Sequence, residues 1–121
     1  MFPSTLIISS SVPTTQKKIK VICQKLQNPL HPNNPDILKI GENSWTIKEI
    51  RQIKYFFSQK PFSHTNKIVI IFNADKMGPP AQNALLKTLE EPGPNNFLIL
   101  TTTKPQALLP TILSRCQSFH L

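Results

Sequence analysis

Short, unbroken runs of apolar residues, separated by amphipathic stretches, constrain the fold of this chain more than any other feature of its sequence. The strongest run covers residues 67–72 (Lys-Ile-Val-Ile-Ile-Phe), and residues 5–8 and 97–100 repeat the pattern. A run that does not alternate with polar residues suits a strand covered on both faces, as in a parallel sheet. Residues 36–40 form a shorter candidate, and residues 117–121 alternate, which is typical of an edge strand.

Amphipathic stretches with recognisable ends lie between these runs. Residues 16–26 place apolar side chains at helical spacing, and residues 47–57 do the same. Thr46 and Glu49, at the start of the second stretch, have capping-box spacing. Residues 79–91 begin with two prolines and are followed by Pro-Gly-Pro, the usual punctuation of a helix. This alternation predicts an α/β sandwich, with a central, mainly parallel five-stranded sheet flanked by helices.

Length, cysteine content and charge bound what such a chain can do. Its 121 residues, 39% of them hydrophobic, suffice for one domain with a packed core. The sequence contains no apolar run long enough to cross a membrane and no signal peptide, so we expect a cytoplasmic protein. Cys23 and Cys116 match no metal-binding spacing, and we expect neither a metal nor a cofactor. The formal charge of +8 fits two explanations equally well: a nucleic acid partner, or a surface whose charge only keeps the protein in solution.

The turn after the first expected strand lacks the residues of a phosphate-binding loop. Such a loop uses glycines, so that backbone N–H groups can curl around phosphate oxygens, followed by Lys and Ser or Thr. Residues 9–18 contain no glycine, Val12 is β-branched, and Pro13 has no amide hydrogen. We therefore predict a degenerate phosphate loop (Walker A) that holds no nucleotide.

The second half of an ATPase site is also missing from the sequence. In an active site, the strand that faces the phosphate loop ends in carboxylates that hold Mg²⁺ and orient the attacking water. Here that strand is followed by Phe72 and Asn73, which carry no carboxylate, and Asp75 lies three residues beyond the usual metal position. A capping role explains Asp75 better than a metal does. We therefore do not expect this chain to be an ATPase by itself.

Specific strings in the second half of the chain resemble the clamp-loader subunits of bacterial DNA polymerase III, which are AAA+ proteins. Residues 84–92 (ALLKTLEEP) are similar to a helix of that family, and residues 109–116 carry its Ser-Arg-Cys motif. Residues 73–77 resemble the delta-prime branch, and the likeness runs from about residue 4 to residue 121. It implies an AAA+ core domain over residues 1–121, with a fold like that of P-loop NTPases and without the lid and collar domains of the family.

The resemblance also implies that Arg115 acts on a neighbouring subunit. In this family the arginine of the Ser-Arg-Cys motif reaches the γ-phosphate of ATP held next door. Ser114 would then fix the start of the last strand by a local hydrogen bond, and Cys116 would pack beneath it. A planar, permanently charged guanidinium suits this role. The plain alternative is a surface arginine paired with an acidic residue.

Three further residues are singled out by the same resemblance. Thr102 matches the sensor-1 polar residue most closely and, without a nucleotide, would be structural. Lys76 and Lys104 lie beside loops that face the central chamber in related assemblies, so they could contact DNA phosphates, although solvated charges explain them equally well.

The expected function is that of a non-catalytic, stator-like subunit that assists sliding-clamp loading in DNA replication. Its implied partners are a gamma/tau-type ATPase subunit, the delta subunit, the sliding clamp and primer–template DNA. Two alternatives stay open: an active AAA+ ATPase with a divergent phosphate loop, and a stand-alone basic DNA-binding module or decayed remnant.

Overall fold

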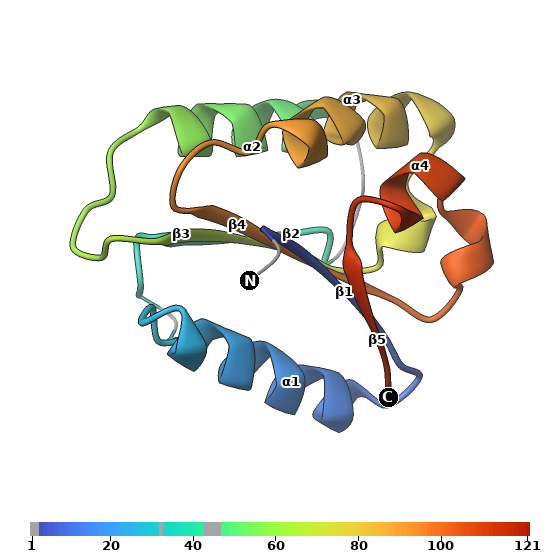
Figure 1. Cartoon of the computed structure of the whole chain (residues 1–121), viewed down its shortest axis with the longest axis horizontal. Coiled ribbons are helices and arrows are strands. Elements are labelled where there is room, and N and C mark those ends of the chain that lie inside the picture. The colour runs from blue at the N-terminus through green and yellow to red at the C-terminus, as the bar shows by residue number, and fades with distance from the viewer. Residues whose placement is uncertain (1–2, 32, 43–46) are drawn as a thin grey trace.

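One parallel sheet organises the chain, as the computed structural model shows (Figure 1). The structure describes residues 3–31, 33–42 and 47–121. The strands lie in the order β2-β3-β4-β1-β5, and each adjacent pair is parallel. Their bounds are β1 (Ser4–Ile8), β2 (Ile37–Ile40), β3 (Lys67–Ile71), β4 (Asn96–Thr102) and β5 (Gln117–His120). The alternating C-terminal segment is an edge strand, as its sequence predicts.

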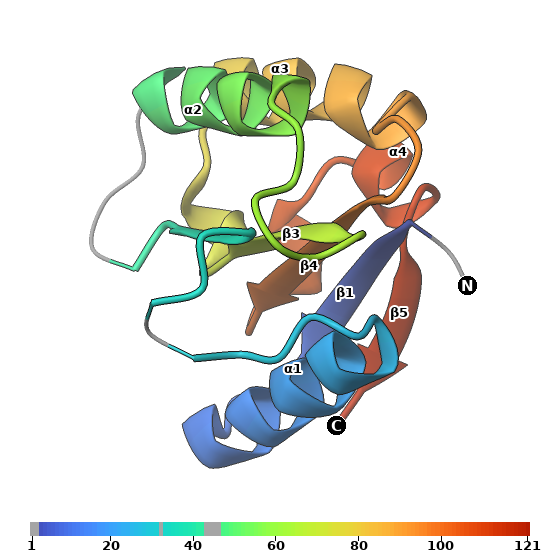
Figure 2. The same cartoon turned by 90° about the vertical axis from the view of Figure 1, so that its left-hand side faces the viewer.

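Helices cover both faces of this sheet. Figures 1 and 2 show α1 on one face and α2, α3 and α4 on the other. The helices are α1 (Val12–Lys25), α2 (Ile47–Ser58), α3 (Pro79–Glu90) and α4 (Pro110–Leu113), and two single 3₁₀ turns are η1 (Ala74–Lys76) and η2 (Pro105–Ala107). The three-layer α/β sandwich expected from the sequence is therefore confirmed.

A separate apolar core lies on each side of the sheet, and strand β3 contributes to both. Ile68 and Ile70 pack in the core beneath α1, whereas Val69 and Ile71 pack in the core beneath α2 and α3. Successive side chains of a strand point to opposite faces, so a central strand covered on both sides must be apolar at every position. This explains the unbroken apolar run that dominates the sequence.

Helix α1 begins four residues earlier than its apolar spacing predicts. Ser11 caps it, with its side chain accepting a hydrogen bond from the Thr14 N–H at 3.3 Å, and Pro13 lies in the first turn, where its missing amide hydrogen costs little. The segment 9–18, which the sequence analysis treated as one turn, is therefore a three-residue turn followed by helix. The cap expected at Thr46 lies outside the described residues.

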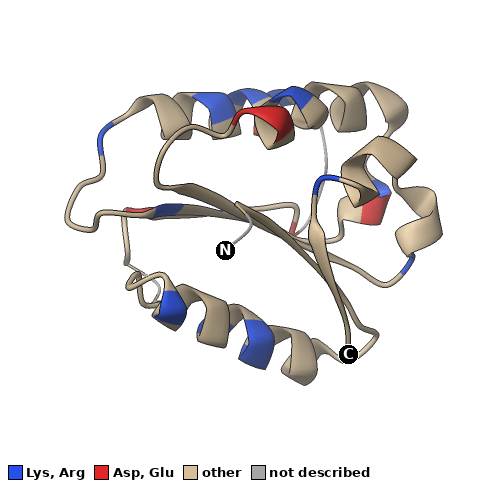
Figure 3. Ribbon diagram, in the orientation of Figure 1, with Lys and Arg blue, Asp and Glu red and all other residues tan. Residues whose placement is uncertain are grey.

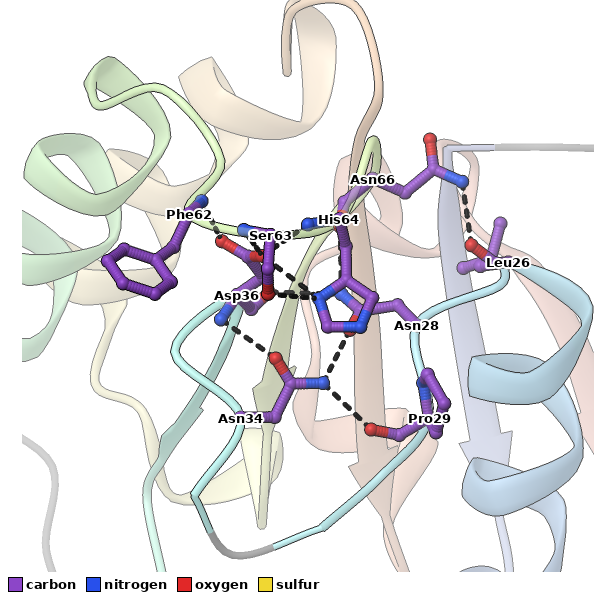
Figure 4. A network of polar contacts seen from close by, with 9 residues as sticks. All are labelled: Leu26, Asn28, Pro29, Asn34, Asp36, Phe62, Ser63, His64 and Asn66. Atoms are coloured by element: carbon purple, nitrogen blue, oxygen red, sulfur yellow. Dashed lines mark hydrogen bonds and ion pairs between the residues drawn. The ribbon is translucent and has the colours of Figure 1, made fainter.

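A buried carboxylate holds the loop between α2 and β3 (Figure 4). Asp36, 1% exposed, accepts the N–H groups of Phe62, Ser63 and His64 at 2.6, 2.9 and 2.8 Å, and its Oδ2 lies 3.0 Å from His64 Nδ1. Burial acts to raise the pKa of Asp36, but the three backbone donors and the His64 side chain outweigh it and lower the pKa from 3.8 to about 2.

Three asparagines extend this network along the amino ends of β2 and β3. Asn28 Nδ2 donates to the carbonyl oxygens of Asp36 and Asn66, at 3.2 and 2.8 Å. Asn34 Oδ1 accepts the Asp36 N–H at 3.0 Å, and Asn66 Nδ2 donates to the Leu26 carbonyl at the end of α1 at 2.7 Å. The network thus joins three segments that are distant in the sequence.

Candidate functional site

A cavity of about 270 Å³ lies at the carboxyl ends of β1, β3 and β4. In open parallel sheets this end of the strands is the usual place for a ligand. The described residues that line it are mostly hydroxyl- and amide-bearing: Ser9, Ser10, Val12, Thr15, Gln16, Glu42, Phe72, Asn73, Thr101, Thr102 and Thr103. None of them is Lys or Arg, although the chain has 14 such residues. The lining can hydrogen-bond a polar group, but it supplies no cation to neutralise a phosphate.

One wall of the cavity is the turn between β1 and α1, whose backbone is already engaged internally. The Ser9 N–H donates to the Thr102 carbonyl at 3.2 Å, and the Ser11 N–H donates to Ser9 Oγ at 3.1 Å. No residue from 9 to 18, all of which the structure describes, has a positive φ. Two N–H groups of the turn are therefore hydrogen-bonded within the chain, and none of its residues has the positive φ that glycines give to a phosphate-binding loop.

The residues after β3 form a hydrogen-bonded corner beside the same cavity. Asn73, with φ of 54°, donates its backbone N–H to Thr101 Oγ1 at 3.2 Å and is the N-cap of η1. Phe72 and Asn73 line the cavity, whereas Asp75 accepts the Thr102 hydroxyl at 2.7 Å. Asn73, and not Asp75, is therefore the N-cap of η1, and the Asp75 side chain ties η1 to the end of β4. The Thr102 hydroxyl also accepts the Lys104 N–H at 3.0 Å.

Arg115 lies far from this cavity along the strand direction. It precedes β5 by two residues, and Gln117 at the start of β5 is in register with Thr5 near the start of β1. The cavity begins at Ser9, at the other end of β1. At about 3.3 Å per residue, the length of β1 separates the two by roughly 15 Å. Arg115 and the cavity of its own chain therefore lie near opposite ends of the sheet.

The turn that carries Arg115 is held by local hydrogen bonds. The Arg115 N–H donates to the Ile112 carbonyl at 3.0 Å, and Ser114 Oγ donates to the Thr111 carbonyl at 3.0 Å. Cys116 is 8% exposed in the core beneath α3, where burial raises the pKa of its thiol to about 12. The Arg115 side chain is 52% exposed, with Nη2 4.0 Å from Glu90 Oε1. The geometry therefore includes the acidic neighbour considered in the sequence analysis.

Lys76 and Lys104 are both exposed, at the end of η1 and immediately before η2. These two turns contact each other near the cavity end of the sheet. Figure 3 shows Lys and Arg on both helical layers as well, so the positive charge is not gathered beside these turns alone.

The sequence analysis missed Gln82, a buried glutamine on α3 that joins this helix to the segment before α4. Gln82 Nε2 donates to the carbonyls of Met77 and Ala107, at 3.0 and 3.1 Å, and Gln82 Oε1 accepts the Leu109 N–H at 2.8 Å. The side chain is 4% exposed. The available signal was weak, because Gln82 shares the buried side of α3 with another polar residue, Thr88.

Comparison with known proteins decides the family. Residues 4–121 match the family described as "DNA polymerase III, delta subunit". The chain is 35% identical over 99 residues to the DNA polymerase III subunit delta' of Haemophilus influenzae. This chain belongs to the delta-prime family of DNA polymerase III subunits. It is also 44% identical over 85 residues, or 69% of its length, to the tau subunit of Bacillus subtilis, so the likeness extends to the tau/gamma branch.

A solved structure supports the same assignment of fold. The crystal structure of a DNA polymerase III gamma subunit-related protein from Thermotoga maritima superimposes with a TM-score of 0.83 and 31% identity, over 98% of this chain and 40% of that one. The AAA+ P-loop-NTPase-like fold expected for a clamp-loader subunit is thus confirmed.

The chain spans only part of the length of its delta-prime and tau relatives. The match to the H. influenzae protein covers 82% of this chain and 30% of that protein, and the match to the tau relative covers 69% of this chain and 15% of that protein. Across the described part of the chain, no helix has both the length and the apolar character needed to cross a bilayer. Within residues 3–31, 33–42 and 47–121, no three His, Cys, Asp or Glu side chains gather in a way that could hold a metal ion.

Replacing Gln82 with Ala is expected to destabilise the fold by about 2–4 kcal/mol, because it removes hydrogen bonds to three backbone groups, one of them buried and two partly buried. Urea unfolding followed by circular dichroism measures the loss. Gln24→Ala, on the exposed side of α1, is the matched control and should change stability by no more than about 0.5 kcal/mol. An equal, small effect of both substitutions would show that the Gln82 hydrogen bonds contribute little.

Proposed function

We propose that this chain is the AAA+ core of a non-catalytic, stator-like clamp-loader subunit. In this proposal it binds no nucleotide and supplies Arg115 in trans to ATP held by a neighbouring gamma/tau-type subunit. The partners are that ATPase, the delta subunit, the sliding clamp and primer–template DNA. The observation that carries the proposal is the placement of Arg115, roughly 15 Å from the cavity of its own chain, at the opposite end of the sheet.

The composition of the cavity supports the first half of the proposal. A bound triphosphate needs cations or free N–H groups around its oxygens. The described lining contains one carboxylate, Glu42, and no Lys or Arg. In an active subunit, carboxylates after β3 would hold Mg²⁺ and orient water. In this chain those positions are occupied by Phe72 and Asn73, and the nearby carboxylate of Asp75 is hydrogen-bonded to Thr102.

The state of Arg115 supports the second half. Its backbone is hydrogen-bonded in the turn after α4, its side chain is half-exposed, and among the described residues its guanidinium has one ion-pair contact, a long one with Glu90. A guanidinium held on a rigid base with an accessible head can donate two hydrogen bonds to the oxygens of a phosphate presented by another molecule.

Reconstitution tests the function as a whole. We expect that adding this subunit to a gamma/tau-type ATPase, the delta subunit, sliding clamp and primed DNA raises the rate of ATP hydrolysis and of clamp loading. No change in either rate on addition of the subunit would refute the proposal.

An active ATPase is the alternative that the tau relative keeps open. We expect isothermal titration of the chain with ATP and Mg²⁺ to give no binding tighter than about 1 mM, because the described lining of the cavity contains no Lys or Arg. A gamma/tau-type subunit titrated in the same buffer is the positive control. A dissociation constant in the micromolar range, with ADP release under turnover, would favour the enzyme.

A further inference from the structure

The contact between Glu90 and Arg115 joins the carboxyl end of α3 to the turn before β5. Glu90 is the last residue of α3, and its Oε1 lies 4.0 Å from Arg115 Nη2. The partial negative charge at the carboxyl end of a helix adds to the attraction for a guanidinium. Two sources of negative potential therefore meet at the side chain that is proposed to act in trans.

The backbone on both sides of this contact is rigidly connected. Gln82 bonds α3 to the carbonyl of Ala107 and the N–H of Leu109, just before α4. The Arg115 N–H is bonded to Ile112 within α4, and Cys116 is buried beneath. Hydrogen bonds and core packing thus connect the two backbone segments, so we expect the ion pair to open by movement of its two side chains.

The contact is also weak enough to be exchanged. At 4.0 Å it is a loose ion pair, and its side chains are 52% and 45% exposed, so water and salt screen it. A phosphate oxygen carries more charge and accepts the guanidinium at hydrogen-bonding distance, which makes it the stronger partner.

We propose that Glu90 is a positioning residue that holds the Arg115 guanidinium in the free subunit and releases it to the phosphate of the neighbouring subunit. This inference rests on the proposed function. Glu90 then competes with the incoming phosphate for the guanidinium. Removing the charge of Glu90 should therefore lower the subunit concentration needed for stimulation, and it should leave the maximal rate unchanged.

The kinetic test compares Glu90→Gln with Glu91→Gln in the reconstituted assembly. Both variants remove one negative charge from adjacent exposed positions, but only Glu90 contacts Arg115 among the contacts of the described residues. We expect E90Q to lower the subunit concentration for half-maximal ATPase stimulation about two- to five-fold, with an unchanged maximal rate, and E91Q to leave both unchanged. The difference should disappear in about 1 M salt. Equal effects of E90Q and E91Q, or an effect of E90Q that persists when Arg115 is Ala, would overturn the inference.

A second measurement needs no partner and separates this inference from the proposed function. The chain has two arginines, Arg51 and Arg115, so the Arg115 Nε–Hε signal in a ¹⁵N NMR spectrum can be assigned with Arg51→Lys. We expect E90Q to shift this signal in the free subunit and E91Q to leave it in place. An unshifted signal overturns the inference even where Arg115→Ala abolishes stimulation, whereas the proposed function does not depend on this signal.

Discussion

Replacing Arg115 with alanine is expected to lower ATP turnover at the neighbouring site by roughly 10³-fold, the lower end of the range for arginine fingers. The guanidinium would neutralise charge that develops on the transferred phosphoryl group. Single-turnover ATP hydrolysis in the reconstituted clamp loader measures the effect directly, because it isolates chemistry from product release.

Two further variants distinguish the effect of the guanidinium group at position 115 from the effect of positive charge in general. Arg115→Lys keeps the charge but loses the planar fork, so we expect only partial rescue. Lys20→Ala removes a positive charge from the exposed face of α1, in the opposite helical layer, and should leave turnover unchanged. If R115A and K20A have the same turnover as the unaltered subunit, Arg115 is not an arginine finger.

The second large effect is expected from Asp36→Asn. In the unaltered chain Asp36 accepts the N–H groups of residues 62–64. Asparagine keeps the shape of the side chain, but its amide group turns N–H donors toward those same N–H groups. We expect a loss of about 2–4 kcal/mol in the free energy of unfolding at pH 7, since charge-assisted bonds to a buried acceptor are lost. Urea unfolding measures it, and Glu42→Gln, at an exposed carboxylate, is the matched control.

The pH dependence of the free energy of unfolding tests the contribution of Asp36 independently. The folded-state pKa of Asp36, about 2, lies below its ordinary value of 3.8, so its contribution is present above about pH 4 and is lost as the pH falls toward 2. That difference corresponds to about 2 kcal/mol. The unaltered chain should lose this stability across the interval, and D36N should not. Parallel pH profiles for the two proteins would contradict the assignment.

Sequence patterns predicted those parts of the fold that depend on local periodicity. The unbroken apolar run of β3, the alternating edge strand β5 and the prolines that open α3 are each readable from a few consecutive residues. The start of α1 was missed because its first turn carries Val12, Pro13 and polar residues in place of apolar spacing, and the Ser11 cap and Pro13 mark it instead.

The polar residues that hold the structure together could not be predicted in this way. Asp36 hydrogen-bonds to residues that lie between 26 and 28 positions later in the sequence, and Gln82 hydrogen-bonds to Ala107 and Leu109. Nothing in the local sequence distinguishes such a side chain from a solvated one, because its partners are backbone groups that every residue possesses. For the candidate site, the sequence singled out Arg115, but only the register of the strands revealed how far it lies from the cavity.

The separation of Arg115 from the cavity also has a consequence for assembly. Contacts that join an arginine at one end of a sheet to a nucleotide at the far end of the next sheet are heterologous, so they propagate head to tail and cannot pair two copies about a twofold axis. A member that offers the arginine while accepting no nucleotide has a donor surface and no matching acceptor. In the proposed assembly, such a member would terminate the row of ATPases and give it a direction.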